Sequence, residues 1–213
     1  MGTDIPSSPR PATARATAVA GFYAAVAVAG FFWHATAQDT NDIWRVEPGQ
    51  ALTWSFLGVL LGTMLGLVVV HVFRALEPWM AWLPALHREF RAIFGRPSNI
   101  EIVLLAAASA LGEELLFRGA MLDAWGITGS SIVFALLHIP PRASLWPWTL
   151  SAFVLGLLLA GVTLTTGNLS AAVFAHFVIN LQNLRYITRH SPAVGLSGPV
   201  RPTPSSGSSI TKP

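Results

Sequence analysis

The sequence contains no cysteine and few charged residues. Without cysteine the protein forms no disulfide and has no thiolate chemistry, and the redox compartment stays open. Asp, Glu, Lys and Arg make up 11% of the 213 residues, against about 25% in a soluble domain. Because 53% of the residues are hydrophobic and the mean hydropathy is +0.55, we predict an integral membrane protein with one domain.

Two common hydrolase signatures are also missing. The chain has no Gly-x-Ser-x-Gly motif for a serine nucleophile and no His-Glu-x-x-His motif for a zinc-bound water. The net charge of +3 does not indicate nucleic-acid binding, because the basic residues are spread over loops and tails. Any catalytic site must therefore be built from other residues.

Long apolar stretches predict an all-α fold, a polytopic membrane bundle of about six transmembrane segments with an interfacial amphipathic helix. The fourth segment has nine residues, which are too few to cross about 30 Å of hydrocarbon as a helix. Either the residues on both sides of it extend the span, or the segment packs inside the protein. The predicted segments are 16–37, 51–73, 100–124, 131–139, 146–166 and 169–186, and the amphipathic helix lies within 74–99.

The first apolar segment resembles a signal peptide in part, because Arg10 and Arg15 precede it and Ala35-Thr36-Ala37 follows its core. It is longer than a signal core of about 7–15 residues, so we predict a retained span. Residues 16–97 then form two accessory transmembrane helices and the interfacial helix, and 98–190 form the core. Pro, Ser and Gly enrichment predicts disordered tails at 1–15 and 191–213.

Two glycine patterns carry structural predictions. Gly58, Gly62 and Gly66 repeat every four residues, which predicts a ridge where another helix approaches closely. Gly126 and Gly129 stand among polar residues and predict a tight turn after the third segment.

The basic residues also predict an orientation. If all six segments cross, every Lys and Arg except Arg45 and Arg118 falls on one side of the membrane. The positive-inside rule then predicts a cytoplasmic N-terminus and C-terminus (N-in/C-in), in a bacterial inner membrane.

An acidic pair and an arginine interrupt the third segment. Ionisable residues in hydrocarbon are rare and usually functional. Glu114 and Arg118 stand at i and i+4 and can pair on one helix face. Glu113 is turned about 100° away from that face, so it is the carboxylate left for chemistry. Packing alone is the alternative role for the Glu114–Arg118 pair.

The depth of a residue in the membrane follows from its distance in residues to the end of its predicted segment. By this count Glu113, His138 and His176 lie at about the same depth. Phe134 with His138, and His176 with Asn180, share helix faces at i and i+4. The other histidines show no such pattern and are expected at the interface or in solvent: His34, His71, His87 and His190.

A carboxylate beside imidazoles can act as a general base on a water molecule, and imidazole or amide N–H groups can stabilise an oxyanion. This predicts a peptide hydrolase that needs no nucleophilic side chain and no cofactor. The alternative is a Zn²⁺ site formed by Glu113, His138 and His176, because two histidines and one carboxylate can hold zinc with an open position.

Three motifs occur in order, Glu-Glu-x-x-x-Arg, Phe-x-x-x-His and His-x-x-x-Asn. They resemble those of the CPBP family, the CAAX-prenyl-protease and bacteriocin-processing intramembrane proteases, also called the ABI family. The resemblance covers residues 98–190. The chain lacks the eight spans of the eukaryotic-type prenyl-protein enzymes, because only six segments are predicted.

The resemblance implies a role for each motif residue. Glu113 and His138 would activate the water. His176 and Asn180 would stabilise the oxyanion. The remaining motif residues would hold the geometry of the site or pack in its core: Glu114, Arg118 and Phe134.

We therefore expect a glutamate-dependent intramembrane endopeptidase that cleaves a membrane-associated protein or peptide near its C-terminus. The predicted topology opens its cavity to the extracytoplasmic side, which suits removal of C-terminal sorting signals better than CAAX processing of a cytosolic prenylated tail. Two alternatives are a non-catalytic bacteriocin-immunity or binding protein, and a small transporter with a buried charge relay. The expected partners are the bilayer and the substrate, and the oligomeric state is left open.

Overall fold

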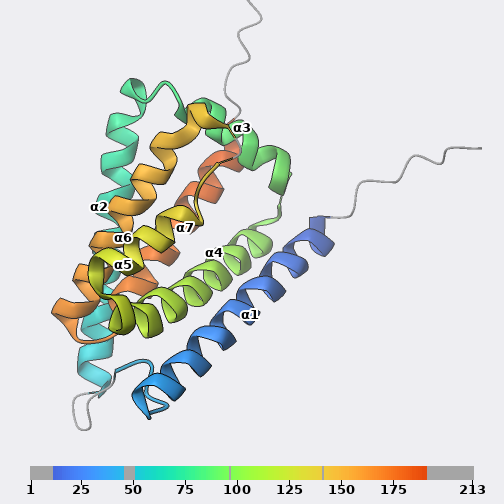
Figure 1. Ribbon diagram of the computed structural model, residues 1–213. Helices are drawn as coiled ribbons and strands as arrows, with labels where there is room; N and C mark the ends of the chain where they lie inside the picture. The colour runs from blue at the N-terminus through green and yellow to red at the C-terminus, as the bar shows by residue number, and fades with distance from the viewer. Residues whose placement is uncertain (1–11, 46–50, 96, 141, 191–213) are drawn as a thin grey trace, which may run out of the picture.

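The computed structural model describes residues 12–45, 51–95, 97–140 and 142–190, and these residues form helices and no strand. This confirms the predicted all-α fold. Two of the short segments are 3₁₀-helices and η2 is a π-helix. In chain order the elements (Figure 1) are α1 (Ala12–Gln38), α2 (Ala51–Leu76), η1 (Glu77–Trp79), α3 (Leu83–Phe94), α4 (Asn99–Glu114), η2 (Leu115–Met121), α5 (Leu122–Leu136), η3 (Ala143–Leu145), α6 (Trp146–Thr166) and α7 (Ser170–Arg189).

The predicted disordered tails fall mostly on residues that the structure does not describe. Residues 12–15, which were predicted to belong to the first tail, instead begin α1. The rest of both tails, 1–11 and 191–213, lies outside the described residues.

Three helical segments among the described residues are long and apolar enough to cross a membrane: Ala16–Gln38, Ser55–Trp79 and Ala143–Thr166. They correspond to the first, second and fifth predicted segments. The other three predicted segments carry charged side chains or are short, so the count of six is not confirmed and stays a prediction.

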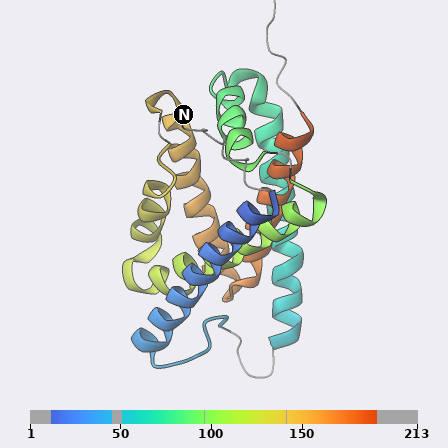
Figure 2. The ribbon, with the colours of Figure 1, turned by 90° about the vertical axis from the view of Figure 1, so that its right-hand side faces the viewer.

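The α4 helix runs through the middle of the bundle. It is flanked on one side by α1 and on the other by α5, α6 and α7 (Figures 1 and 2). The start of α1, the start of α4 and the end of α7 point toward the same end of the bundle, where α3 also lies. This places the two described chain ends together, as the N-in/C-in prediction requires, although the orientation itself stays a prediction.

A sharp turn separates the third and fourth predicted segments. Gly126, with φ 69° and ψ −177°, breaks the helical geometry inside α5, as the glycine pattern predicted. The helix that follows ends at Leu136, shortly before Pro140, which cannot continue a helix. His138 therefore lies at the end of a half-length helix inside the bundle.

The glycine ridge of α2 packs against α7. A Cβ atom built at Gly62 would lie 2.2 Å from the backbone oxygen of Ala171, and one at Gly66 would lie 2.7 Å from that of Ala175. Backbone atoms cannot move aside cheaply, so the small residues are required for this contact. The predicted close approach is confirmed, and it fixes the helix that carries His176.

We expect Gly62→Ala to destabilise the protein by about 1–3 kcal/mol, because the added methyl group meets the α7 backbone. Thermal unfolding in detergent measures the effect. The matched control is Gly161→Ala in α6, where a Cβ would meet nothing within 4 Å and helix propensity favours alanine. Equal unfolding temperatures for the two variants would contradict this account of the ridge.

The amphipathic region contains α3, whose apolar face packs partly on the protein itself. Leu83 and Leu86 are buried against Leu145 of η3, with Trp148 of α6 beside them. On the same helix His87 is partly buried. Burial lowers the pKa of His87, and the positive charges of two neighbouring arginines lower it further, against an opposing effect of Glu77. The ring is thus neutral at pH 7.

Candidate active site

The helix that carries the acidic pair, α4, has a well-defined N-terminal cap. Ser98 accepts a hydrogen bond from the backbone N–H of Glu101, and the Glu101 side chain accepts one from the backbone N–H of Ser98, forming a capping box. Glu113 and Glu114 stand at the other end of α4, where the α-helical geometry changes to the π-helix η2. Both carboxylates are buried.

Glu114 lies at the centre of a buried polar network. Its Oε1 accepts a hydrogen bond from Arg118 Nη1 at 2.9 Å and one from His176 Nδ1 at 2.6 Å. Arg118 Nη2 donates to the carbonyl oxygen of Gly156 in α6 at 3.1 Å. Glu114 and Arg118 have no exposed surface. The predicted i, i+4 pair therefore forms, and it links η2 to α6 and α7.

Glu113 points at both imidazoles. Its Oε2 lies 3.9 Å from His138 Nε2 and 3.8 Å from His176 Nε2. These distances exceed a hydrogen bond and suit a bridging water. Among the described residues Oε2 has no hydrogen-bond partner, although it is buried. Three separate helical elements thus bring these side chains to one point.

The partner of each Nδ1 sets the hydrogen position on its ring. His138 Nδ1 lies 2.7 Å from the carbonyl oxygen of Phe134, which only accepts, so Nδ1 must donate. His176 Nδ1 donates to the Glu114 carboxylate in the same way. In the neutral rings both Nε2 atoms are therefore acceptors, and both face Glu113.

Phe134 forms one wall of this site. Its ring centroid lies 4.5 Å from that of His138 and 6.1 Å from that of His176. The guanidinium carbon of Arg118 lies 4.6 Å from the same ring centroid, within the range of a cation–π contact. Phe134 is therefore buried packing around the motif residues.

Asn180 lies one helical turn from His176 and faces α4. Its Nδ2 donates to Ser109 Oγ at 2.9 Å. Ser109 precedes Glu113 by four residues, so the two share a face of α4. This contact uses one of the two hydrogens of the amide nitrogen and leaves one for another acceptor.

The zinc alternative gains no support from the side chains. Among the described residues no group of three or more His, Cys, Asp or Glu has the arrangement of a metal site. Metal dependence is therefore left to experiment.

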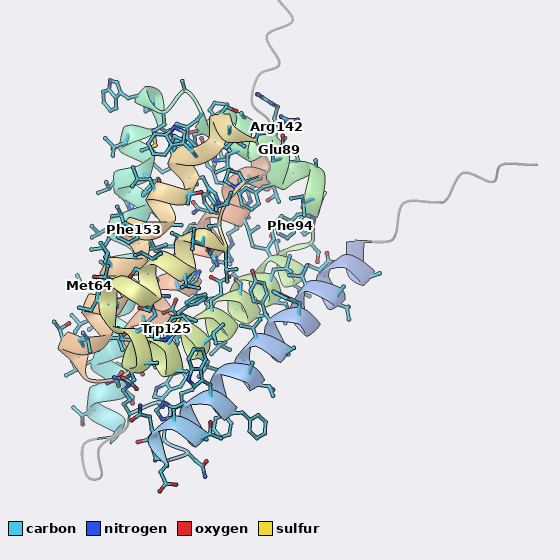
Figure 3. The ribbon with its side chains drawn as sticks, in the orientation of Figure 1. Met64, Glu89, Phe94, Trp125, Arg142 and Phe153 are labelled. Carbon is cyan, nitrogen blue, oxygen red and sulfur yellow. The ribbon has the colours of Figure 1, made fainter. Side chains whose placement is uncertain are left out.

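A groove of about 500 Å³ opens next to His138, between α5, η3 and α6. Its lining is mostly apolar and includes Leu136 of α5 and Trp146 of α6. Thr149, also in the lining, donates its hydroxyl hydrogen to the carbonyl oxygen of His138 at 3.0 Å. Arg142 lines the groove as well and pairs with Glu89 of α3 at 2.5 Å (Figure 3).

His34 was expected at the interface or in solvent, and this prediction is wrong. It is 3% exposed, and its Nδ1 donates to the carbonyl oxygen of Gly119 in η2 at 2.8 Å. Arg45 donates to the carbonyl oxygen of Arg118 at 3.0 Å and pairs with Asp123 at 2.6 Å. His34 and Arg45 therefore each donate a hydrogen bond to a backbone carbonyl oxygen of the π-helix. No sequence spacing connects them to the motifs.

The same stretch of chain is the one that matches a known family. Residues 96–182 fit the family model described as type II CAAX prenyl endopeptidase Rce1-like. This match is a similarity to the family over part of the chain, and the three motifs predicted it. The Rce1-like range contains all seven motif residues, and the family points to an intramembrane peptidase. With its three long apolar helices, the chain is an integral membrane protein.

A protein of Bacillus subtilis (strain 168), the uncharacterized protein YpbD, is 28% identical to the chain over 160 residues. The match covers 73% of this chain and 79% of YpbD, so the likeness extends beyond the Rce1-like range. No solved structure gives a significant match to the chain.

Proposed function

We propose that this protein is an intramembrane endopeptidase in which Glu113 activates a water molecule to cleave a membrane-associated protein or peptide near its C-terminus. One observation supports this most directly. Within the part of the chain that the structure describes, the buried Glu113 Oε2 has no hydrogen-bond partner, and it faces two imidazole nitrogens at 3.8 and 3.9 Å. A water molecule between them would contact the carboxylate and both imidazoles at once.

The proton transfers follow from these partners. Glu113 takes one proton from the water, and the neutral His138 holds the other hydrogen through Nε2. The water oxygen attacks the carbonyl carbon of the scissile peptide bond. When that C–N bond breaks, the protonated Glu113 gives its proton to the leaving amine. Carboxyl and amine products result, and Glu113 is ready for the next water.

The negative charge that develops on the attacked carbonyl oxygen must be stabilised by hydrogen-bond donors. His176 serves when protonated, because Glu114 holds its Nδ1–H and directs Nε2–H into the site. Asn180 serves through the amide hydrogen that Ser109 does not use. Both residues lie on one face of α7, so a single helix would carry the oxyanion site.

The apolar groove next to His138 supports a membrane-embedded substrate. Its lining suits the apolar flank of a substrate segment, while the scissile bond reaches Glu113. With an N-in/C-in orientation in a bacterial inner membrane, the site is open to exported proteins, so we propose C-terminal sorting-signal removal over CAAX processing of a prenylated tail.

The test compares the C-termini of membrane and secreted proteins in cells with this gene, without it, and with it restored. We expect a small set of proteins with extended C-termini in the deletion strain and their loss on restoration. Identical C-termini in all three strains would overturn the proposal and favour the immunity or transport alternatives. Purified protein should also cleave the substrate found this way in the presence of a metal chelator, and loss of activity would instead favour zinc.

A further inference from the structure

The loop after α1, residues 39–45, contacts two elements of the site although it lies outside the Rce1-like range. Ile43 is buried, and a Cβ atom built at Gly119 of η2 would lie 2.7 Å from its Cγ1. The indole N–H of Trp44 donates to Ser170 Oγ, at the start of α7, at 2.9 Å. This loop lies at the end of the bundle opposite α3 (Figures 1 and 2). It therefore contacts η2 and α7 together.

Arg45 in this loop joins η2 to the start of α5. Its Nη2 donates to the carbonyl oxygen of Arg118 at 3.0 Å and to Asp123 Oδ1 at 2.6 Å. Asp123 lies in the first turn of α5, three residues before the break at Gly126. The φ of Arg45 is 59°, in the left-handed region that residues other than glycine rarely adopt, and surrounding contacts must hold it there. One guanidinium thus spans the junction between the π-helix and the helix that leads to His138.

His34 adds a second contact at the same junction, from the end of α1. It is buried and donates to the carbonyl oxygen of Gly119 at 2.8 Å. The same nitrogen lies 3.9 Å from Asp123 Oδ2, the carboxylate oxygen that Arg45 does not use. Two side chains from outside the Rce1-like range therefore bind adjacent carbonyl groups of η2 and face one carboxylate of α5.

We propose that Arg45 is a positioning residue, with His34 as a second donor, and that the two fix the junction of η2 and α5 so that His138 faces Glu113. This inference rests on the proposed function, in which Glu113 and His138 act on one water. Their separation, 3.9 Å between Oε2 and Nε2, depends on how α5 leaves η2. A misplacement of about 1 Å can cost about 100-fold in rate, so a contact that fixes this junction affects the chemistry.

The first test measures geometry and uses no substrate. The chain has no cysteine, so Leu104→Cys in α4 and Ile132→Cys in α5 give two unique sites for spin labels, and both positions are exposed. Pulsed electron paramagnetic resonance on the full chain in detergent measures the distance between the labels. In Arg45→Met we expect the distance to shift or its distribution to broaden by about 1–2 Å, the scale of shifts between packed helices. An unchanged distribution would overturn the inference.

The second test separates rate from binding, with the substrate identified from the extended C-termini. In Arg45→Met, kcat should fall about 10-fold or more while KM stays within about 2-fold, because the geometry at the water changes and the groove does not. Arg45→Lys should restore most of the rate, because an ammonium group also has donors for both oxygens. A residue that only stabilised the fold would lower the unfolding temperature and leave kcat per folded molecule unchanged, and that result would contradict the positioning role.

The matched control is Arg88→Met, the same change at an exposed arginine of α3, and it should alter neither the label distance nor kcat. Asp123→Asn should act as Arg45→Met does, and the double variant should lose less than the product of the two single losses, because both changes break one contact. Fully independent losses would exclude action through Asp123. A changed label distance in a protein that cleaves nothing would retain Arg45 as the link between η2 and α5 and reject the peptidase function alone.

Discussion

Replacing Glu113 with glutamine should abolish hydrolysis while the protein still inserts and folds. The amide has the shape of the carboxylate but cannot take a proton from water. General acid–base catalysis contributes about 10²- to 10⁴-fold, so we expect the initial rate to fall at least 100-fold. The measurement is the rate of cleavage of the substrate identified from the extended C-termini, alongside thermal unfolding in detergent.

The geometry around Glu113 explains why folding should survive. Oε2 has no hydrogen-bond partner among the described residues, so the amide displaces no direct bond there. Asp39→Asn is the matched control, because it makes the same chemical change at an exposed carboxylate and should keep full activity. Full activity in Glu113→Gln would exclude Glu113 as the base.

Arg118→Met should be the most destabilising single change at the site. The arginine has no exposed surface and pairs with Glu114 at 2.9 Å. Removing one partner of a buried ion pair leaves an uncompensated charge and costs about 3–5 kcal/mol. The unfolding temperature in detergent should fall accordingly, and the yield of folded protein should fall with it.

The double variant Glu114→Gln with Arg118→Met separates charge from geometry. It removes both charges, so it should recover much of the lost stability. It should remain inactive, because the carboxylate that orients His176 is gone. If the double variant were less stable than Arg118→Met, the pair would not be acting through its charge.

The arrangement of the motif residues could be predicted because it depends on the number of residues between them and on their distance from the segment ends. The i, i+4 spacing of Glu114 and Arg118 fixes their pairing on any helix, and a common depth for Glu113, His138 and His176 follows from the segment ends. Their catalytic roles stay predictions. The three motifs also indicate, from sequence alone, the family that residues 96–182 resemble.

The features that could not be predicted depend on which face of each helix packs inward and on where each helix ends. An apolar helix such as α1 gives no sign of which face packs inward, so the buried His34 could not be assigned. The count of six spans is not confirmed because the third, fourth and sixth predicted segments carry charged side chains or are short. An amphipathic pattern fits both a helix in the headgroup layer and a helix packed on the protein, and Leu83 and Leu86 of α3 are buried against η3.

Because η2 is a π-helix, the number of residues in it sets how α5 is rotated relative to α4. Its closing bond joins the N–H of Leu122 to the carbonyl oxygen of Phe117, five residues back. Each residue turns a helix by about 100°, so a one-residue deletion between Glu114 and Asp123 would rotate α5 against α4. Asp123 would then turn away from Arg45 while Glu114 still faced His176. A point substitution in this stretch leaves the rotation of α5 relative to α4 unchanged, whereas a change of length would turn one half of the site away from the other.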